Sequence, residues 1–352
     1  MTANKKVFLI FILLAVSVLS TPTFAKDSFK VCWSIYVGWM PWDYGANEGI
    51  VKKWADKYGI KIDVVQINDY IESINQYTAG GFDGCTMTNM DALTIPAAGG
   101  VDSTALVVGD FSNGNDGIVL KGKKNLKDIK GQKVNLVELS VSHYLLARAL
   151  ESVKMSEKDV KVVNTSDADM VAAYGTPDVT SVVTWNPLLS EIEAMPKSTK
   201  VFDSSKIPGE IIDLMVVNTK TLKENPKFGK ALSGAWYEIM AAMKDGAKKA
   251  KSARTFMAKA SGTDLKGYEA QLATTQMFYE AKDAVEFTNS PKLKQTMKYV
   301  AEFSFKHGLL GEGAPDAGFI GIETPSGVFG SSSNVKLRFD PSYMKMAADG
   351  KL

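Results

Sequence analysis

The stretch Val31–Ile50, VCWSIYVGWMPWDYGANEGI, carries the pattern that decides the fold. It begins as an apolar run typical of a buried strand and runs into the helical spacing of residues 48–58. The loop predicted between them is rich in aromatic residues and holds Tyr36, Trp39, Trp42, Asp43 and Tyr44. Large aromatic side chains are costly to leave in water, and loops at the ends of a scaffold often carry function. We therefore expect this loop to form a wall of a binding site.

Strand-like and helix-like segments alternate along the chain on both sides of this stretch. The predicted strands are 30–36, 61–66, 83–87, 104–110, 117–121, 133–137, 161–164, 181–185 and 214–218. The predicted helices are 48–58, 70–79, 90–98, 141–152 and 167–174, followed by 228–243, 248–260, 267–273 and 291–307. From residue 225 onward the pattern is mainly helical, with no obvious strand. Alternation of this kind predicts an α/β fold with mostly parallel sheets covered by helices.

Polar, glycine-rich turns divide this pattern into two α/β units. The chain is expected to cross between them near residues 111–117 and 210–215. We predict a discontinuous first lobe of residues 26–116 and 214–352, with a helical C-terminal part, and an inserted second lobe of residues 117–213. Ligands of open parallel sheets bind beyond the carboxyl ends of the strands, and often between domains. The expected site is thus a cleft between two doubly wound sheets.

The first 25 residues have the features of a secretory signal peptide. Lys5 and Lys6 precede an apolar stretch, and small residues at Thr23 and Ala25 fit a cleavage site after Ala25. The stretch is short for a membrane span, although an anchor is the alternative, and no later run reaches 18 apolar residues. We expect an exported, soluble mature chain.

Charge and metal-binding residues exclude two classes of function. Loss of the signal peptide would lower the 41 basic residues to 39, equal to the 39 acidic ones, which argues against a nucleic-acid-binding protein. Cys32, Cys85, His143 and His307 are too few and too scattered in sequence for a zinc site. Export would permit a disulfide, but cross-strand geometry often does not, so we expect two buried thiols.

Four sequence stretches, taken in order, resemble a known family. They are GWMPWDYGANEGIVKKWADKYGIKIDVV, GFDGCTMTNMDAL, DIKGQKVNLVELSVSHYLLARAL and VTSVVTWNPLLSEI. The chain resembles type II periplasmic substrate-binding proteins of ABC transporters, in the nitrate/sulfonate/taurine-type superfamily. The wording SIYVGWMPWDYG is most similar to the branch associated with urea carboxylase gene regions. The resemblance implies a periplasmic venus-flytrap protein that takes up guanidine-like or urea-like compounds.

The same resemblance indicates the partners and the oligomeric state of the protein. Its partners would be a small solute and an inner-membrane permease, with no nucleic acid. We expect a monomer that needs no cofactor and binds no metal.

Candidate ligand-binding residues stand where the predicted strands end. They are Tyr36, Trp39, Trp42, Asp43, Asn89, Asp91, Asp110, Glu138, Ser140, Trp185 and Asp213. This set is aromatic and acidic, and Arg148 should lie roughly 12 Å from the start of its helix, outside the pocket. Aromatic faces and carboxylates together favour a small planar cation. Neutral urea would also need donors such as Asn89, Asn186 or Ser140, and a sulfonate, nitrate or pyrimidine ligand is a further alternative.

Several of these residues have an equally ordinary structural explanation. Asp91 fits a helix N-cap as well as a ligand contact, and Ser140 fits an N-cap better. Asp43 could form only an Asx-type turn.

An exported hydrolase and a thiamine-pyrimidine biosynthetic protein of the same fold are rival hypotheses. His143 follows Ser140 and Ser142, but residues adjacent in sequence seldom make a catalytic triad. The hydrolase motifs G-x-S-x-G and H-E-x-x-H are absent from the sequence, and export argues against the biosynthetic protein. We therefore expect a binding protein and not an enzyme.

Overall fold

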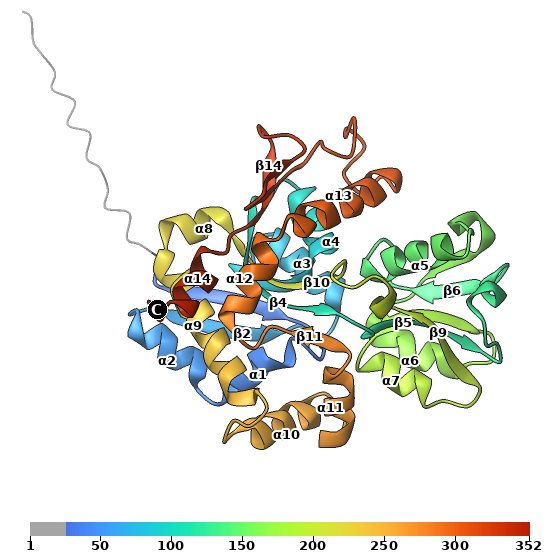
Figure 1. Ribbon diagram of the computed structural model, residues 1–352, viewed down its shortest axis with the longest axis horizontal. Coiled ribbons are helices and arrows are strands. Elements are labelled where there is room, and N and C mark those ends of the chain that lie inside the picture. Colours follow the sequence, from blue (N-terminus) through green and yellow to red (C-terminus); the bar gives the residue numbers. More distant parts are fainter. Residues whose placement is uncertain (1–25) are drawn as a thin grey trace, which may run out of the picture.

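The computed structural model describes residues 26–352, and these residues form two α/β lobes (Figure 1). The larger lobe lies around β4 and β10 in the figure, and the smaller lobe, with α5, α6 and α7, lies to its right. The expected signal peptide, residues 1–25, lies outside the described residues. The α/β, two-lobed fold predicted from the sequence is confirmed.

The larger lobe is built on a nine-stranded mixed sheet. Its strand order is β13-β12-β14-β4-β10-β3-β1-β2, and β11 pairs with β4. The strands are β1 (Ser28–Trp33), β2 (Lys61–Gln66), β3 (Gly84–Thr88), β4 (Ser103–Ser112), β10 (Ile212–Asn218), β11 (Thr275–Met277), β12 (Gly321–Thr324), β13 (Gly327–Phe329) and β14 (Val335–Phe339). Strand β1 is parallel to both β2 and β3, whereas β10 is antiparallel to β3 and β4. The start of β10 therefore shares an edge with the ends of β3 and β4.

The smaller lobe is built on a five-stranded sheet in the order β7-β6-β8-β5-β9. Its strands are β5 (Asp116–Lys121), β6 (Lys133–Leu136), β7 (Lys161–Asn164), β8 (Ser181–Trp185) and β9 (Ser198–Asp203). The chain enters this sheet through residues 113–115 and leaves it through residues 204–211. The exact lobe boundaries, at 116/117 and 213/214, stay a prediction.

Helices cover both sheets (Figure 1). They are α1 (Met40–Asn47), α2 (Ile50–Lys57), α3 (Tyr70–Thr78), α4 (Asn89–Ala92), α5 (Val141–Ser152), α6 (Asp167–Gly175), α7 (Leu188–Glu193), α8 (Thr219–Glu224), α9 (Pro226–Met243), α10 (Ala250–Ala260), α11 (Leu265–Leu272), α12 (Ala281–Asn289), α13 (Pro291–Lys306) and α14 (Ser342–Ala348). Within residues 26–352, no helix is long and apolar enough to cross a membrane.

Two expectations about local structure were wrong. The aromatic stretch is a loop only as far as Trp39, because helix α1 begins at Met40 with Pro41 in its first turn. Proline suits that position, since its fixed φ matches a helix and its missing N–H would be unpaired there. The C-terminal part also contains strands, β11 to β14, which extend the larger sheet beyond β4.

The expectation of two buried thiols was also wrong. Cys32 and Cys85 form a disulfide. They lie directly opposite each other on the parallel neighbours β1 and β3, with their Cα atoms 4.4 Å apart. That separation is at the short end of the range that a disulfide spans.

Candidate ligand-binding site

A small cavity lies where the two lobes meet, and the space inside it that a water-sized molecule can occupy is about 10 Å³. Its lining is aromatic, acidic and apolar: Tyr36, Trp39, Tyr70, Thr88, Asp116, Val141, Trp185, Ile211 and Asp213. Among residues 26–352, no lysine or arginine lines it. That is about the space that one water molecule needs, so in this conformation the lining side chains nearly fill the cavity, and a larger solute requires them to move apart.

Strand ends bring these residues together. In the larger lobe, Tyr36 and Trp39 follow β1, Thr88 ends β3, and Asp213 lies at the start of the antiparallel β10. The smaller lobe adds Trp185 at the end of β8, and also Asp116 and Val141 at the starts of β5 and α5. The cavity therefore lies at the carboxyl ends of parallel strands, as expected for open α/β sheets.

Four aromatic rings form a connected wall across both lobes. The ring centroids of Tyr36 and Trp39 are 4.9 Å apart, and those of Trp39 and Tyr70 are 5.6 Å apart. Tyr70 in turn meets Trp185 of the other lobe edge to face at 5.7 Å. The wall offers π faces of the kind that attract cations.

Four buried carboxyl groups surround this wall. Asp116 and Asp213 line the cavity. Asp110 accepts a 2.9 Å hydrogen bond from the Tyr36 hydroxyl, and Asp91 accepts a 2.6 Å bond from the Tyr70 hydroxyl. In the described part of the chain, none of the four forms an ion pair with a lysine, arginine or histidine. The site thus concentrates acid groups without a basic partner.

Burial changes the acidity of these groups. It raises the pKa of Asp91 to about 6 and the pKa values of Asp110 and Asp116 to about 7. For Asp213, burial and then the negative charge of Asp110 raise the pKa well above its ordinary value. The cause is the cost of holding a charged carboxylate away from water.

Polar atoms around the cavity lack partners within residues 26–352. They are Nε1 of Trp39, Oδ1 of Asp91, Oδ2 of Asp110 and Oδ2 of Asp213. Buried polar groups are normally hydrogen-bonded, so unpaired ones at a cavity indicate a place for a ligand or water.

Gly38 permits the close approach of these groups. A Cβ atom at this position would lie 2.5 Å from the Tyr36 ring and 2.6 Å from Oδ2 of Asp110. Any side chain here would displace the pair that Tyr36 and Asp110 form.

The structure brings six of the predicted site residues to the cavity or into direct contact with its lining. Tyr36, Trp39, Trp185 and Asp213 line it, while Asp110 and Asp91 hold its tyrosines. Asp91 is not the N-cap of α4, because Thr88 holds that position and donates to its carboxylate.

The other five predicted residues lie outside the cavity lining. Trp42 packs against Trp236 in the core, with centroids 5.1 Å apart, because α1 turns it inward. Asp43 accepts a bond from Asn47 in the first turn of α1. Asn89 accepts from the Ile212 N–H and so ties α4 to β10.

The remaining two come from the turn before α5. Glu138 is exposed to solvent. Ser140 is the N-cap of α5, accepting from the Ser142 N–H and donating to the Val137 carbonyl, so both of its bonds stay local.

Five lining residues were absent from the predicted set: Tyr70, Thr88, Asp116, Val141 and Ile211. Thr88 directly follows a predicted strand, and Tyr70 begins a predicted helix. Their positions at the ends of these elements could have identified both as candidates. Asp116 lies in a stretch that indicates only a turn. Ile211 and Val141 are ordinary apolar residues, and only the three-dimensional structure places them here.

The arginine nearest to the predicted site is held elsewhere, as expected. Arg148 donates from Nε to Glu210 Oε2 at 2.9 Å and from Nη2 to Oε1 at 3.0 Å. It does not line the cavity.

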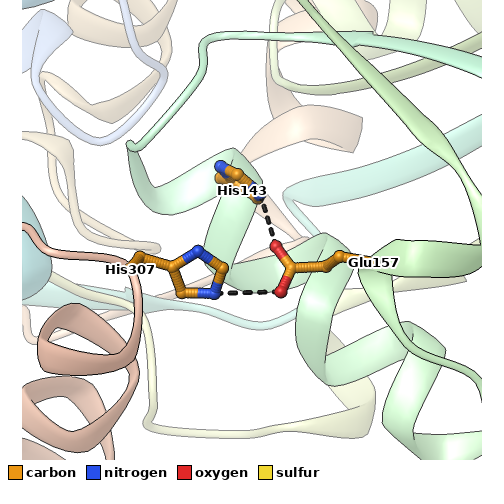
Figure 2. Close-up of side chains that lie close together, drawn as sticks. All are labelled: His143, Glu157 and His307. Carbon is orange, nitrogen blue, oxygen red and sulfur yellow. Dashed lines mark hydrogen bonds and ion pairs between the residues drawn. The ribbon is translucent and has the colours of Figure 1, made fainter.

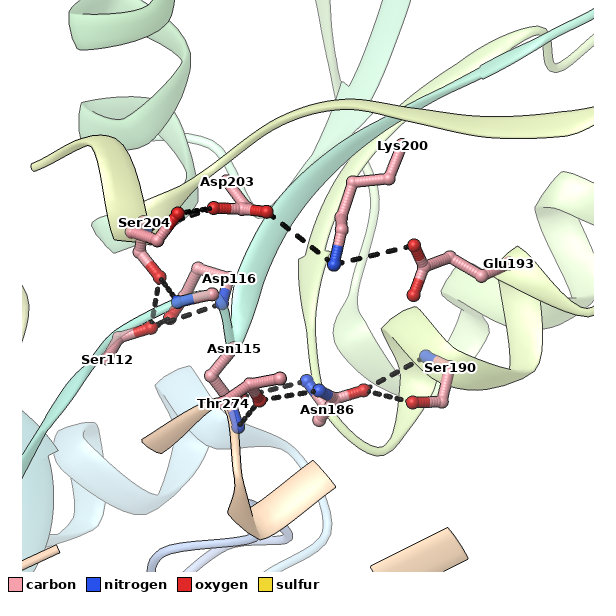
Figure 3. A network of polar contacts seen from close by, with 12 residues as sticks. Ser112, Asn115, Asp116, Asn186, Ser190, Glu193, Lys200, Asp203, Ser204 and Thr274 are labelled. Atoms are coloured by element: carbon pink, nitrogen blue, oxygen red, sulfur yellow. Dashed lines mark hydrogen bonds and ion pairs between the residues drawn. The ribbon is translucent and has the colours of Figure 1, made fainter. Parts of the chain in front are cut away.

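A polar network ties the lobes together beside the cavity (Figure 3). Asn115 donates from Nδ2 to the Thr274 hydroxyl at 3.1 Å, and it accepts from the Asn186 N–H at 3.1 Å. Asn186 also donates to the Thr274 hydroxyl, at 3.2 Å. Asp116 accepts a hydrogen bond from the Ser112 hydroxyl in the same region. These hydrogen bonds therefore link the crossover segment to both lobes in one place.

The two histidines meet at one carboxylate, although the sequence spacing suggested that they were scattered (Figure 2). Nε2 of His143 is 2.6 Å from Oε1 of Glu157, and Nε2 of His307 is 2.9 Å from Oε2. His143 and Glu157 belong to the smaller lobe and His307 ends α13 of the larger lobe. The cluster is a second junction between the lobes.

The hydrogen bonds of His143 do not suit a metal ion. Its Nδ1 accepts from the Leu139 N–H at 3.1 Å, so its proton must be on Nε2, where it donates to Glu157. A metal ion bound to Nε2 would require the ring proton to be on Nδ1, where two donors, this N–H and the Leu139 N–H, would face each other. Metal-binding histidines instead donate their second nitrogen to an acceptor.

The cluster also offers no serine nucleophile. The Ser140 hydroxyl donates to Val137, whereas His143 is bonded to Glu157. Ser142 Oγ has no hydrogen-bond partner in the described part of the chain. A serine–histidine pair that catalysis would need is not formed.

Comparison with known proteins shows the family to which the chain belongs. The model of the family described as NMT1/THI5 like matches residues 51–251. A putative binding protein of Brucella abortus (strain 2308) is 24% identical over 180 residues, which cover 50% of this chain and 56% of that protein. The taurine-binding periplasmic protein of Escherichia coli (strain K12) is 24% identical over 132 residues, 36% of this chain and 40% of that one. The chain therefore spans about half the length, or less, of these curated relatives.

Solved structures share the fold at low identity. The alkanesulfonate-binding protein of Xanthomonas axonopodis pv. citri superposes with a TM-score of 0.67 at 14% identity, covering 82% of this chain and 96% of that one. The periplasmic nitrate-binding protein of Synechocystis PCC 6803 gives a TM-score of 0.59 at 12% identity, covering 93% and 99%. At such identities the likeness concerns the fold alone.

Proposed function

Because the chain belongs to the NMT1/THI5 like family, we propose that it is the solute-binding component of an ABC importer. Its ligand is a small nitrogen-rich solute, either guanidinium or a urea-like compound. The observation that carries this choice is the composition of the cavity, which has buried carboxyl groups and four aromatic rings and no basic residue in its described lining.

The charges of the site support a cation. Guanidinium is planar, so its faces match aromatic rings and its N–H edge matches carboxylate oxygens. Asp213 and Asp116 lie in the lining, and Oδ2 of Asp213 has no partner in the described residues. A buried cation needs such compensating charge, because a charge without a partner is very costly away from water.

An anion is the second candidate, and two observations favour it. Relatives are named for alkanesulfonate, nitrate and taurine. The Trp39 Nε1–H lacks an acceptor, and helix α5 begins at Val141 in the lining, so donors are present. Buried carboxylates would repel an anion, however, and the bidentate arginine that suits oxyanions is missing from the described lining.

The proposed mechanism is closure of the two lobes around the ligand. In the structure the lobes touch on both sides of the cavity: the Ser166 hydroxyl donates to Asp69 at 3.0 Å, and Trp185 meets Tyr70. Opening would break these contacts and let the solute enter. The closed, loaded protein then docks on a membrane permease, which the family relationship supports. We propose a periplasmic, monomeric protein with lobes of residues 26–116 plus 214–352 and 117–213.

Thermal unfolding with a panel of solutes tests this proposal. Ligand at a hundred times its Kd stabilises the folded state by about 2.7 kcal/mol, which raises the Tm by roughly 2–4 °C. We expect millimolar guanidinium chloride to raise the Tm relative to sodium chloride at equal ionic strength. A rise with taurine or nitrate, and none with guanidinium, would replace the cation by the anion. Enzymatic turnover of any of these compounds would support an enzymatic function instead of a binding function.

A further inference from the structure

Asp213 lines the cavity, and the carboxyl group of Asp110, which is outside the lining, lies beside it in the sheet. They are direct cross-strand partners on β4 and β10. Both are buried, with 0% and 3% of their surface exposed, and Oδ2 of each lacks a partner in residues 26–352. The Tyr36 hydroxyl occupies Oδ1 of Asp110.

Within the described residues, no positively charged group acts on this pair. The ionisable groups that act on it from neighbouring elements are Tyr36, Asp116, Tyr268 and Tyr279, none of which can supply a cation. Two adjacent buried carboxylates cannot both be ionised at moderate cost, so at least one proton is retained by the pair. Burial raises the pKa of Asp110, and the neighbouring Asp213 lowers it by a smaller amount.

A cation entering the cavity changes this balance. Its positive charge would replace that of the proton, and the proton would pass to solvent. The charge of the buried site is then the same before and after binding, so the low-dielectric penalty is not increased. A cation that entered while the proton stayed would leave the site with one extra positive charge.

We propose that Asp110 and Asp213 are a proton-for-cation exchange pair and thereby determine the ligand specificity of the site. Each guanidinium that binds displaces one proton from the pair, whereas a neutral ligand such as urea binds with the proton in place. This inference rests on the proposed function and extends it, since it states how one cavity separates a cation from a neutral compound of the same shape.

The exchange predicts opposite pH trends for different ligands. If one proton leaves, the affinity for guanidinium rises about tenfold per pH unit between roughly pH 5 and 6.5. The affinity for urea stays flat over the same range. An anion would need additional protons, so its affinity would fall as the pH rises.

Isothermal titration calorimetry of the mature protein tests the exchange. Guanidinium chloride is titrated at pH 6.5 in phosphate and in imidazole buffers, whose ionisation enthalpies differ. We expect the measured heats to differ by an amount corresponding to release of about one proton per ligand, as the charge balance requires. Urea, titrated in the same way, should give heats that do not depend on the buffer.

Isosteric variants locate the proton. Asp213→Asn imitates the protonated acid, so the protein should fold while proton release falls toward zero and guanidinium affinity falls by roughly 100-fold, the effect of losing a buried charge partner. Asp110→Asn is the second variant and should behave alike. Asp56→Asn, on the exposed face of α2 and paired with Lys52, is the control and should match the wild type.

The possible failures are distinguishable. Guanidinium binding with buffer-independent heat would overturn the exchange and leave the proposed function intact. Absence of guanidinium binding in every buffer would overturn the proposed function and the exchange with it. Unchanged proton release in both Asn variants would show that other groups carry the proton.

Discussion

Trp39 and Trp42 show how far the sequence can assign individual residues. Both stand in one aromatic stretch, and both were predicted to contact a ligand. Trp39 lines the cavity beside Tyr36, whereas Trp42 stacks on Trp236 in the core. The difference arises because helix α1 begins at Met40, with Pro41 in its first turn, so that Trp42 lies on the helix and faces the core. Residue type alone predicts an aromatic site but cannot state which aromatic residue faces it.

A matched pair of substitutions separates these two roles. Trp39→Leu removes a ring face from the cavity and should weaken guanidinium binding about 30-fold, since a desolvated cation–π contact is worth ~2 kcal/mol. Trp42→Leu should lower the Tm while leaving the Kd within about twofold, because its contacts are in the core. Calorimetric Kd values and thermal unfolding of both variants are the measurements. Equal losses of affinity in both would contradict the assignment.

The buried carboxyl groups predict the pH dependence of the ligand-free protein. Burial raises the pKa of Asp91 to about 6 and that of Asp110 to about 7, so the folded protein binds more protons than the unfolded chain. Their contribution to stability is therefore complete below about pH 4 and is lost as the pH rises through 6 to 7. We expect the Tm to fall by on the order of 5 °C between pH 5 and 8. The fall should be smaller in Asp110→Asn, and a Tm that rises equally in both proteins would contradict the account.

At the scale of elements, the sequence predicted the strands up to residue 218 well, apart from β9, and the later ones poorly. Strands β1 to β4 are apolar runs bounded by turns or helical spacing, and this pattern is informative. Strands β11 and β13 have only three residues each, and β14 alternates lysine and arginine with apolar residues inside a loop-rich segment. Short edge strands are defined by their partners in the sheet, here β4 and β12, and their own sequences contain little of that information.

The disulfide is a property of two elements and not of either cysteine alone. Neighbouring strands β1 and β3 bring Cys32 and Cys85 opposite each other. It closes a loop with a sequence separation of 53, so its loss should destabilise the protein by roughly 2–4 kcal/mol. Urea unfolding of the wild type and of the Cys32→Ser/Cys85→Ser double variant measures this. Two free thiols in the non-reduced, unfolded wild type would contradict the assignment.

At the scale of the whole molecule, the lobes meet at the cavity, at the Asn115 network and at the His143–Glu157–His307 cluster. The sequence predicted two lobes and a cleft from the order of strands and helices. It could not predict the cluster, because His143 and His307 are 164 positions apart and come from different lobes. Contacts of this kind join the two lobes, and local sequence patterns contain no information about them.

Removal of the shared carboxylate tests the part played by this cluster in closure. Glu157→Ala breaks the contact with His307 of the other lobe and should raise the Kd for ligand by about two- to fivefold, as a partly exposed pair would. Glu224→Ala is the control, because its ion pair with Lys220 is exposed and lies within α8, so it should not affect closure. Kd values with small-angle scattering of both ligand-free variants are the readouts. Equal Kd values in Glu157→Ala and Glu224→Ala would contradict a role in closure.

Burial also lowers the pKa of His307, and the negative charge of Glu157 raises it by a smaller amount. The folded protein therefore binds fewer protons at this site than the unfolded chain, and its stability contribution is lost as the pH falls below about 6.5. This trend opposes that of the carboxyl groups. In His307→Gln, the decline in Tm between pH 5 and 8 should consequently be steeper than in the wild type, and a shallower decline would contradict the assignment.

The central claim is that the cavity selects a cation, and a direct comparison of affinities tests it. Calorimetric titration of the mature protein at pH 7.5 with guanidinium chloride, and separately with taurine and sodium nitrate, is the measurement. The cavity described here predicts saturable binding of guanidinium with one site per chain and no measurable heat from the two other solutes. Saturable binding of taurine or nitrate together with no binding of guanidinium would contradict it.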